Sequence, residues 1–145
     1  MTYEELCLQI KEHDLLVPGE FSYLLPGIIE FMYNGCGAEW MPEITRKALS
    51  WLYRHYDAAV HIHDIRFELA DGSVESLRKV NEEFLSNCLK LWRKRFGFFR
   101  YINPYALWEL KKIKTAYRFL LLFSGKAWCA AFQKNHPNMK VNLYE

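Results

Sequence analysis

Apolar side chains recur every three or four residues along most of this chain, which is the spacing that places them on one face of an α-helix. The pattern is clearest in two consecutive segments, about 44–69 and about 74–95, separated by Ala-Asp-Gly at 70–72. The stripes of these segments comprise Leu49, Leu52, Tyr56, Val60, His63 and Phe67, and then Leu77, Asn81, Phe84, Cys88 and Leu91 or Trp92. The pattern predicts two helices that fold back on each other as an antiparallel pair.

Residue types that start helices mark three further boundaries. Thr2 and Glu5 match a capping box, so a short amphipathic helix is expected to open the chain. Ser73 is suited to cap the second helix of the pair. Asn103 followed by Pro104 predicts the start of a third long helix.

Glycine and proline divide the rest of the chain. Residues 17–41 are rich in both and are expected to be irregular, and long loops in compact domains commonly carry function. The third long helix is predicted to end at Ser124-Gly125, with a last short helix from Trp128 to about Gln133. No segment alternates apolar and polar residues as a strand would. We therefore expect an all-α fold.

Composition and charge exclude several classes of protein. With 145 residues, 51% hydrophobic and 25% charged, the chain is most simply one globular domain over 1–145, neither disordered nor fibrous. A net charge of +2 points to no particular partner. No window reaches the roughly 18 uninterrupted apolar residues of a membrane span. No signal peptide is recognised, so a cytoplasmic location is expected.

The cysteines show no metal-binding spacing. The four residues are Cys7, Cys36, Cys88 and Cys129, and no two of them form a Cys-x-x-Cys motif. Free buried thiols in a reducing compartment are the favoured interpretation, and one disulfide is the alternative.

His63 and Asn81 are placed symmetrically about a turn. Each lies nine residues from Gly72, so in two helices folded back there, at about 1.5 Å a residue, they would face each other. A neutral imidazole can take a proton from water at physiological pH, and Asp64 adds a carboxylate beside it. The arrangement indicates either a hydrolytic site or a buried His–Asn pair without catalysis.

Nearby oxygen donors favour calcium as the metal of such a site. Calcium takes six to eight oxygen ligands, including carboxylates and backbone carbonyls. Asp64 and the carbonyls of Tyr-Asn-Gly-Cys-Gly at 33–37 would meet that requirement. His61 and His63 with Asp64 could instead bind zinc, but residues two apart on a helix do not face each other. His61 is expected on the solvated surface.

Three segments together resemble the phospholipase A2 superfamily. They are Tyr-Asn-Gly-Cys-Gly at 33–37, Val-His-Ile-His-Asp-Ile-Arg-Phe at 60–67 and Val-Asn-Glu-Glu-Phe-Leu-Ser-Asn-Cys at 80–88. The similarity is greatest to phage and prokaryotic phospholipase A2-like proteins and weaker to the phospholipase domain of parvovirus capsids. In this superfamily a glycine-rich calcium loop precedes a helix with an adjacent His-Asp pair, and an antiparallel helix supplies an acidic residue. The resemblance covers 33–92, the motif-bearing core.

The resemblance implies calcium-dependent hydrolysis of an acyl ester in glycerophospholipids, in a phage-infected or prophage-bearing bacterium. His63 would be the general base. Asn81 stands where the superfamily has an aspartate that orients the histidine, so slow activity is expected. The implied calcium ligands are Asp64, the carbonyls of Gly35 and Gly37, and Glu39. The alternative is a catalytically degenerate scaffold that serves a phage as a binding or structural protein.

Residues 90–101 combine five basic residues with aromatic ones. Such a mixture suits anionic lipid headgroups or a nucleic acid. A helix end whose rings pack inward while its cations face water would give the same composition. With the phospholipase resemblance, a phospholipid or membrane surface is the expected partner, and nucleic acid is the less favoured one.

Overall fold

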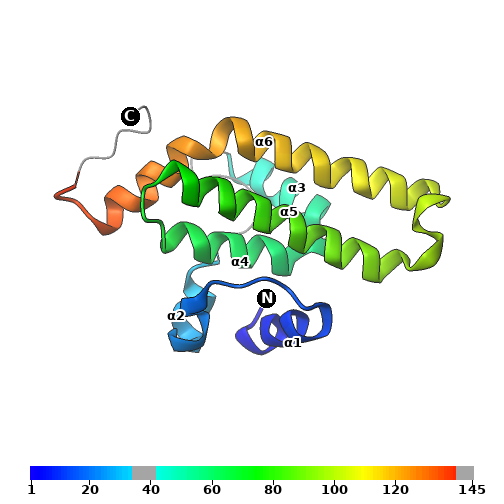
Figure 1. The fold of residues 1–145 in the computed structure, drawn as a ribbon, viewed down its shortest axis with the longest axis horizontal. Helices are drawn as coiled ribbons and strands as arrows, with labels where there is room; N and C mark the ends of the chain where they lie inside the picture. The colour runs from blue at the N-terminus through cyan, green and yellow to red at the C-terminus, as the bar shows by residue number, and fades with distance from the viewer. Residues whose placement is uncertain (34–41, 140–145) are drawn as a thin grey trace.

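A computed structural model describes residues 1–33 and 42–139 of the chain (Figure 1). All secondary structure within these ranges is helical, which confirms the predicted all-α fold. The α-helices are α1 (Tyr3–His13), α2 (Pro26–Phe31), α3 (Glu43–Tyr53), α4 (Asp57–Glu68), α5 (Val74–Phe96) and α6 (Pro104–Asn135). Short 3-10 helices are η1 (Gly19–Tyr23), η2 (Arg54–Tyr56) and η3 (Phe98–Tyr101). None of the helices in the described ranges is long and apolar enough for a membrane span.

The predicted N-termini of α1, α5 and α6 are confirmed by their caps. Thr2 and Glu5 form a reciprocal capping box, with the Glu5 carboxylate 2.8 Å from the Thr2 backbone nitrogen. The Ser73 hydroxyl and the Asn103 side-chain oxygen each accept from backbone N–H groups in the first turn that follows. These bonds satisfy donors that a helix leaves unpaired at its start.

The prediction of one continuous helix over 44–69 is wrong, because η2 divides this segment into α3 and α4. Two tyrosines at this division bond to α6. Tyr53 Oη donates to the Lys112 carbonyl at 3.3 Å, and Tyr56 Oη donates to Glu109 Oε2 at 2.8 Å. A 3-10 turn keeps both rings on the side of α6, so the apolar periodicity continues through the division.

The predicted end at Ser124-Gly125 is also wrong, because α6 runs unbroken to Asn135 and includes the segment expected as a separate helix. Ser124 is buried against α5, where its hydroxyl accepts from Asn81. Glycine costs only about 1 kcal/mol in a helix interior. Tertiary packing offsets that cost here.

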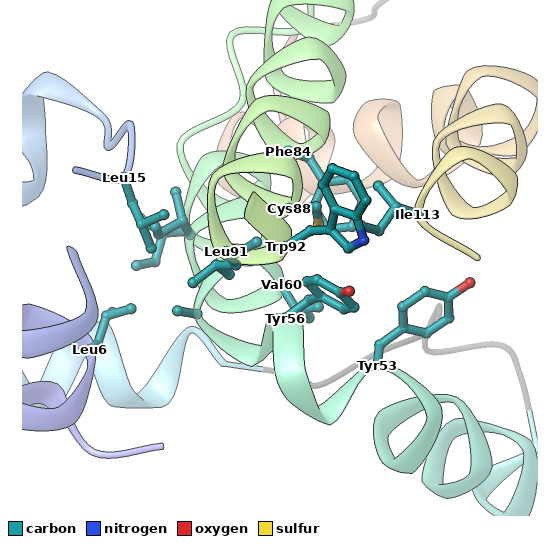
Figure 2. Close-up of a cluster of buried hydrophobic side chains, with 14 of the residues drawn as sticks. Leu6, Leu15, Tyr53, Tyr56, Val60, Phe84, Cys88, Leu91, Trp92 and Ile113 are labelled. Carbon is teal, nitrogen blue, oxygen red and sulfur yellow. The ribbon is translucent and has the colours of Figure 1, made fainter. Parts of the chain in front are cut away.

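The α4 and α5 helices lie side by side in opposite directions, and α6 packs along both (Figure 1). Figure 2 shows the core between them, where Val60, Phe84, Trp92 and Ile113 point toward one another. Trp92 Nε1 donates to the Ala106 carbonyl at 2.8 Å and so ties α5 to the start of α6.

The N-terminal segment covers the other side of α4 and α5. Leu6 and Leu15 bring its apolar side chains into the core (Figure 2). The buried Asn87 of α5 accepts from the Leu16 N–H at 2.7 Å and donates to the Leu16 carbonyl at 2.8 Å. Both bonds satisfy the polar atoms of the Asn87 side chain, which is 0% exposed.

The cysteines within the described ranges are free thiols. Cys88 is buried, and Cys7 and Cys129 are half-buried. Cys36 lies outside the described residues.

Candidate functional site

His63 on α4 and Asn81 on α5 lie opposite each other across the helix pair. His63 Nε2 is 3.3 Å from Asn81 Oδ1. Asn81 is only 2% exposed, and its Nδ2 donates to Ser124 Oγ on α6 at 3.1 Å. An imidazole, an amide and a hydroxyl thus link three helices in series.

The amide orientation determines which imidazole nitrogen carries the proton. Because Asn81 Nδ2 donates to Ser124, its oxygen faces His63 and can only accept. With the amide in this orientation, Nε2 is the protonated nitrogen of the neutral ring, and Nδ1 keeps its lone pair as the basic atom of His63.

Aromatic rings flank His63, which is half-buried. Its ring centroid lies 4.6 Å from that of Phe67 and 5.1 Å from that of Phe84, and Phe67 packs in turn on Trp128 at 5.1 Å. Burial lowers the pKa of His63 to about 4, against the smaller raising effect of the hydrogen bond with Asn81. The imidazole is therefore neutral at physiological pH, as a base must be, but it binds a proton weakly.

Asp64 is the one predicted calcium ligand that the structure describes. It follows His63 on α4 and is half-buried. The other predicted ligands, Gly35, Gly37 and Glu39, lie outside the described residues. Within 1–33 and 42–139, no group of three or more His, Cys, Asp or Glu side chains could hold a metal ion.

The chain just before the glycine-rich segment is anchored on α4. Tyr33 donates from its hydroxyl to Asp57, and its ring lies 4.7 Å from that of His61. His61 Nε2 donates to the Ile29 carbonyl at 2.8 Å. Asp64 follows His61 by three residues, or roughly 4.5 Å along the helix. Residue 33 therefore meets α4 within about one turn of Asp64.

His61 is not on the solvated surface, and that expectation is wrong. Its side chain is 0% exposed between α2 and α4, and burial lowers its pKa. It bonds to α2 whereas His63 bonds to α5. The two imidazoles therefore serve different helices, which removes the zinc alternative built on them.

The two best-formed surface hollows of the described residues do not open onto His63. These hollows, of about 520 Å³ and 410 Å³, are lined mainly by polar residues, among them Glu5 and Asp57 for the first and Asp14 and Lys90 for the second. Neither is bordered by the imidazole or by Asp64.

A second buried polar cluster was missed by sequence reasoning. Glu109 on α6 is 1% exposed and accepts from Tyr56 at 2.8 Å and from Lys112 at 3.0 Å. Burial opposes its ionisation, but the bonds from Lys112 and Tyr56 outweigh that effect and hold the pKa of Glu109 below its usual value. A carboxylate four residues before the buried Ile113, on the same stripe, was the available signal.

Ser124 was missed as well, because it was interpreted as part of a helix end. Its spacing of four residues from the buried Trp128 would have placed it on the inner face of α6.

Comparisons with protein-family models, with curated proteins and with solved structures find no match to this chain.

Proposed function

We propose that this protein hydrolyses an acyl ester of a glycerophospholipid, slowly and with calcium, and that His63 is the general base. The observation that carries the proposal is the hydrogen bond from His63 Nε2 to Asn81 Oδ1. It holds a neutral imidazole with Nδ1 as the proton acceptor. The order of the glycine-rich segment, the His-Asp pair and the second helix adds the phospholipase A2 resemblance.

The chemistry requires one base and one source of positive charge. A water oxygen attacks the ester carbonyl carbon while its proton passes to His63 Nδ1. The tetrahedral intermediate then breaks its bond to the alcohol oxygen, and the imidazolium returns the proton to that leaving oxygen. The products are a fatty acid and a lysophospholipid. Calcium held by Asp64 would supply charge for the oxyanion.

The reaction is expected to be slow because His63 is a weak base. General bases work best when their pKa lies near the operating pH, and that of His63 is about 4. Asn81 orients the ring without adding the negative charge that would favour an imidazolium. The rate should therefore stay level as the pH falls from about 8 to about 5, with no loss near the usual histidine pKa of about 6.5.

A second candidate is the catalytically degenerate scaffold. The observation that favours it is the mutual pairing of His63, Asn81 and Ser124 among packed rings. Such a pairing satisfies buried polar groups whether or not a reaction takes place. The chain would then act as a binding or structural protein.

Fatty-acid release from mixed phospholipid vesicles distinguishes the two candidates. We expect slow, calcium-dependent release by the wild type and none by His63→Gln. Asn81→Asp should be at least roughly tenfold faster, because a carboxylate there favours the imidazolium. His136→Gln, at the exposed C-terminal end of α6, is the matched control. Equal background rates from all four proteins would favour the second candidate, in which the chain is a catalytically degenerate scaffold.

Calcium binding is tested separately from turnover. A ligand that binds only the native state raises the melting temperature. Millimolar calcium should stabilise the wild type and stabilise Asp64→Asn less. Magnesium at the same concentration is the control, since it requires a smaller and more rigid site. An unchanged melting temperature for the wild type would count against calcium at Asp64.

A further inference from the structure

The connection between α5 and α6 presents apolar side chains to solvent. Phe98, Phe99 and Ile102 are 88%, 65% and 74% exposed. The connection, residues 97–103 and here called the tip, lies at the end of the helix pair away from the α4–α5 connection (Figure 1). Three adjacent side chains without a polar atom form an apolar patch, and such patches mark interaction surfaces.

The stretches of chain that lead into and out of the tip carry basic side chains only, and Lys90 among them pairs with Asp14 at 3.1 Å. No aspartate or glutamate occurs between Glu83 and Glu109. The same interval contains Lys90, Arg93, Lys94, Arg95 and Arg100. The cations at 93–95 are exposed in the last turn of α5, next to the tip.

Tyrosine and tryptophan side chains, whose rings each carry one polar atom, lie between the apolar residues of the tip and the rest of the protein. Tyr101 ends η3, and Tyr105 and Trp108 lie in the first two turns of α6, all three exposed. Tyrosine and tryptophan favour the boundary between hydrocarbon and headgroups, where lysine and arginine meet anionic phosphates. The exposed side chains are therefore apolar at the tip and amphipathic or cationic behind it. This order matches the change from hydrocarbon to headgroups at a bilayer surface.

The protein holds the tip in a defined conformation. Gly97 takes a φ of 56°, a value that favours glycine, where the chain leaves α5. Asn103 caps α6 directly after the tip, and Trp92 bonds across to Ala106. The apolar residues are therefore presented by two anchored helix ends, and little ordering is required when they bind.

We propose that the tip inserts into the surface of an anionic phospholipid bilayer and anchors the protein there. From Asn81 to Gly97 the α5 helix rises roughly 24 Å, so the anchor is distinct from the His63 site and does not depend on catalysis. Nucleic acid is less suited, because single strands stack on open ring faces along a groove. Phe98 and Phe99 instead pack edge to face, at an interplanar angle of 86°.

Vesicle sedimentation tests the apolar part of the anchor. Wild type should sediment with vesicles of phosphatidylglycerol and phosphatidylcholine in equal parts. The double variant Phe98→Ser, Phe99→Ser should bind them at least about tenfold more weakly. Leu122→Ser with Phe123→Ser removes an exposed apolar pair further along α6 and should bind as the wild type does. Equal binding by all three proteins would overturn the proposal.

Charge variants test the lipid chemistry. Arg93→Gln with Lys94→Gln should weaken binding to the anionic vesicles roughly 30-fold, since each cation near the surface contributes about 1 kcal/mol. Arg78→Gln with Lys79→Gln removes the same charge near the other end of α5 and should have little effect. Equal weakening by both pairs, or equal wild-type binding to pure phosphatidylcholine, would contradict the anchor.

Two other binding partners of the tip would give different results in these experiments. A wild-type dimer that Phe98→Ser with Phe99→Ser converts to monomer, without any vesicle binding, would assign the tip to a second copy of the chain. Salt-sensitive binding to single-stranded DNA, without vesicle binding, would assign it to nucleic acid. His63→Gln must keep the vesicle affinity of the wild type, because the anchor is separate from the catalytic proposal.

Discussion

Replacing His63 with glutamine should reduce the dependence of stability on pH. The pKa of His63 is about 4 in the folded protein, against about 6.5 for an ordinary imidazole. Between these values the unfolded chain binds more protons than the folded protein does. The free energy of unfolding therefore falls as the pH is lowered from about 6.5 to about 4, and above that window the imidazole contributes no pH dependence.

The expected loss is large relative to the stability of a small domain. Each pH unit between the folded and unfolded pKa is worth about 1.36 kcal/mol, so full protonation removes about 3 kcal/mol of stabilisation. At about pH 4.5, between 2 and 3 kcal/mol is already lost. Whole domains have a free energy of unfolding of about 5–15 kcal/mol.

Urea unfolding followed by circular dichroism, at about pH 7.5 and about pH 4.5, measures this difference. On acidification, His63→Gln should lose about 2 to 3 kcal/mol less than the wild type loses. The lowered pKa values of His55 and His61 act in both proteins and cancel in the comparison. His136→Gln should lose as much as the wild type. Equal losses in the wild type and His63→Gln would refute the shielding of His63 by the surrounding rings.

Two further predictions concern the buried polar contacts of α6. Ser124→Ala removes the acceptor for the Asn81 amide and should cost about 1 to 3 kcal/mol in urea unfolding, because a buried donor is left unpaired. Glu109→Gln should lower the free energy of unfolding by about 3 kcal/mol, because Lys112 keeps its charge without a counter-ion. The double variant with Lys112→Met should recover part of that loss, and an additive further loss would contradict the pairing.

Sequence periodicity predicted the helix pair well because α4 and α5 bury apolar stripes at helical spacing. It could not predict η2, since a single 3-10 turn leaves the spacing of Leu52 and Tyr56 intact. It also placed His61 on the surface, because it assumed that α4 has one buried face. In the fold α4 is covered by α1 as well as by α5 and α6, and His61 bonds to Ile29 of α2, so residues on several sides of α4 are buried.

For the candidate site, the spacing about Gly72 predicted the apposition of His63 and Asn81, which the 3.3 Å contact confirms. Ser124 and Glu109 were beyond sequence reasoning for a different reason. Each lies on α6, and its partner on an earlier element depends on how α6 is rotated and shifted along that element. Local patterns do not fix this tertiary register.

Asn81 is neutral and therefore suits the protein interior better than the aspartate that the phospholipase A2 superfamily has at the corresponding position. The buried carboxylate of this helical core, Glu109, has the counter-charge of Lys112 three residues on in α6. Near Asn81 the aromatic rings offer no such charge, and burial has already lowered the pKa of His63. A carboxylate there could accept from the Ser124 hydroxyl, but it would gain a counter-charge only by protonating His63.

Asn81→Asp should therefore have opposite effects on stability and on catalysis. We expect it to lower the free energy of unfolding by about 1 to 3 kcal/mol at neutral pH, because an ion pair is desolvated where a neutral pair was. The same carboxylate raises the pKa of His63, so fatty-acid release should increase. Nitrogen NMR of the His63 ring measures that pKa directly. A higher pKa without faster release would leave His63 a structural residue, whereas an unchanged pKa would contradict the contact itself.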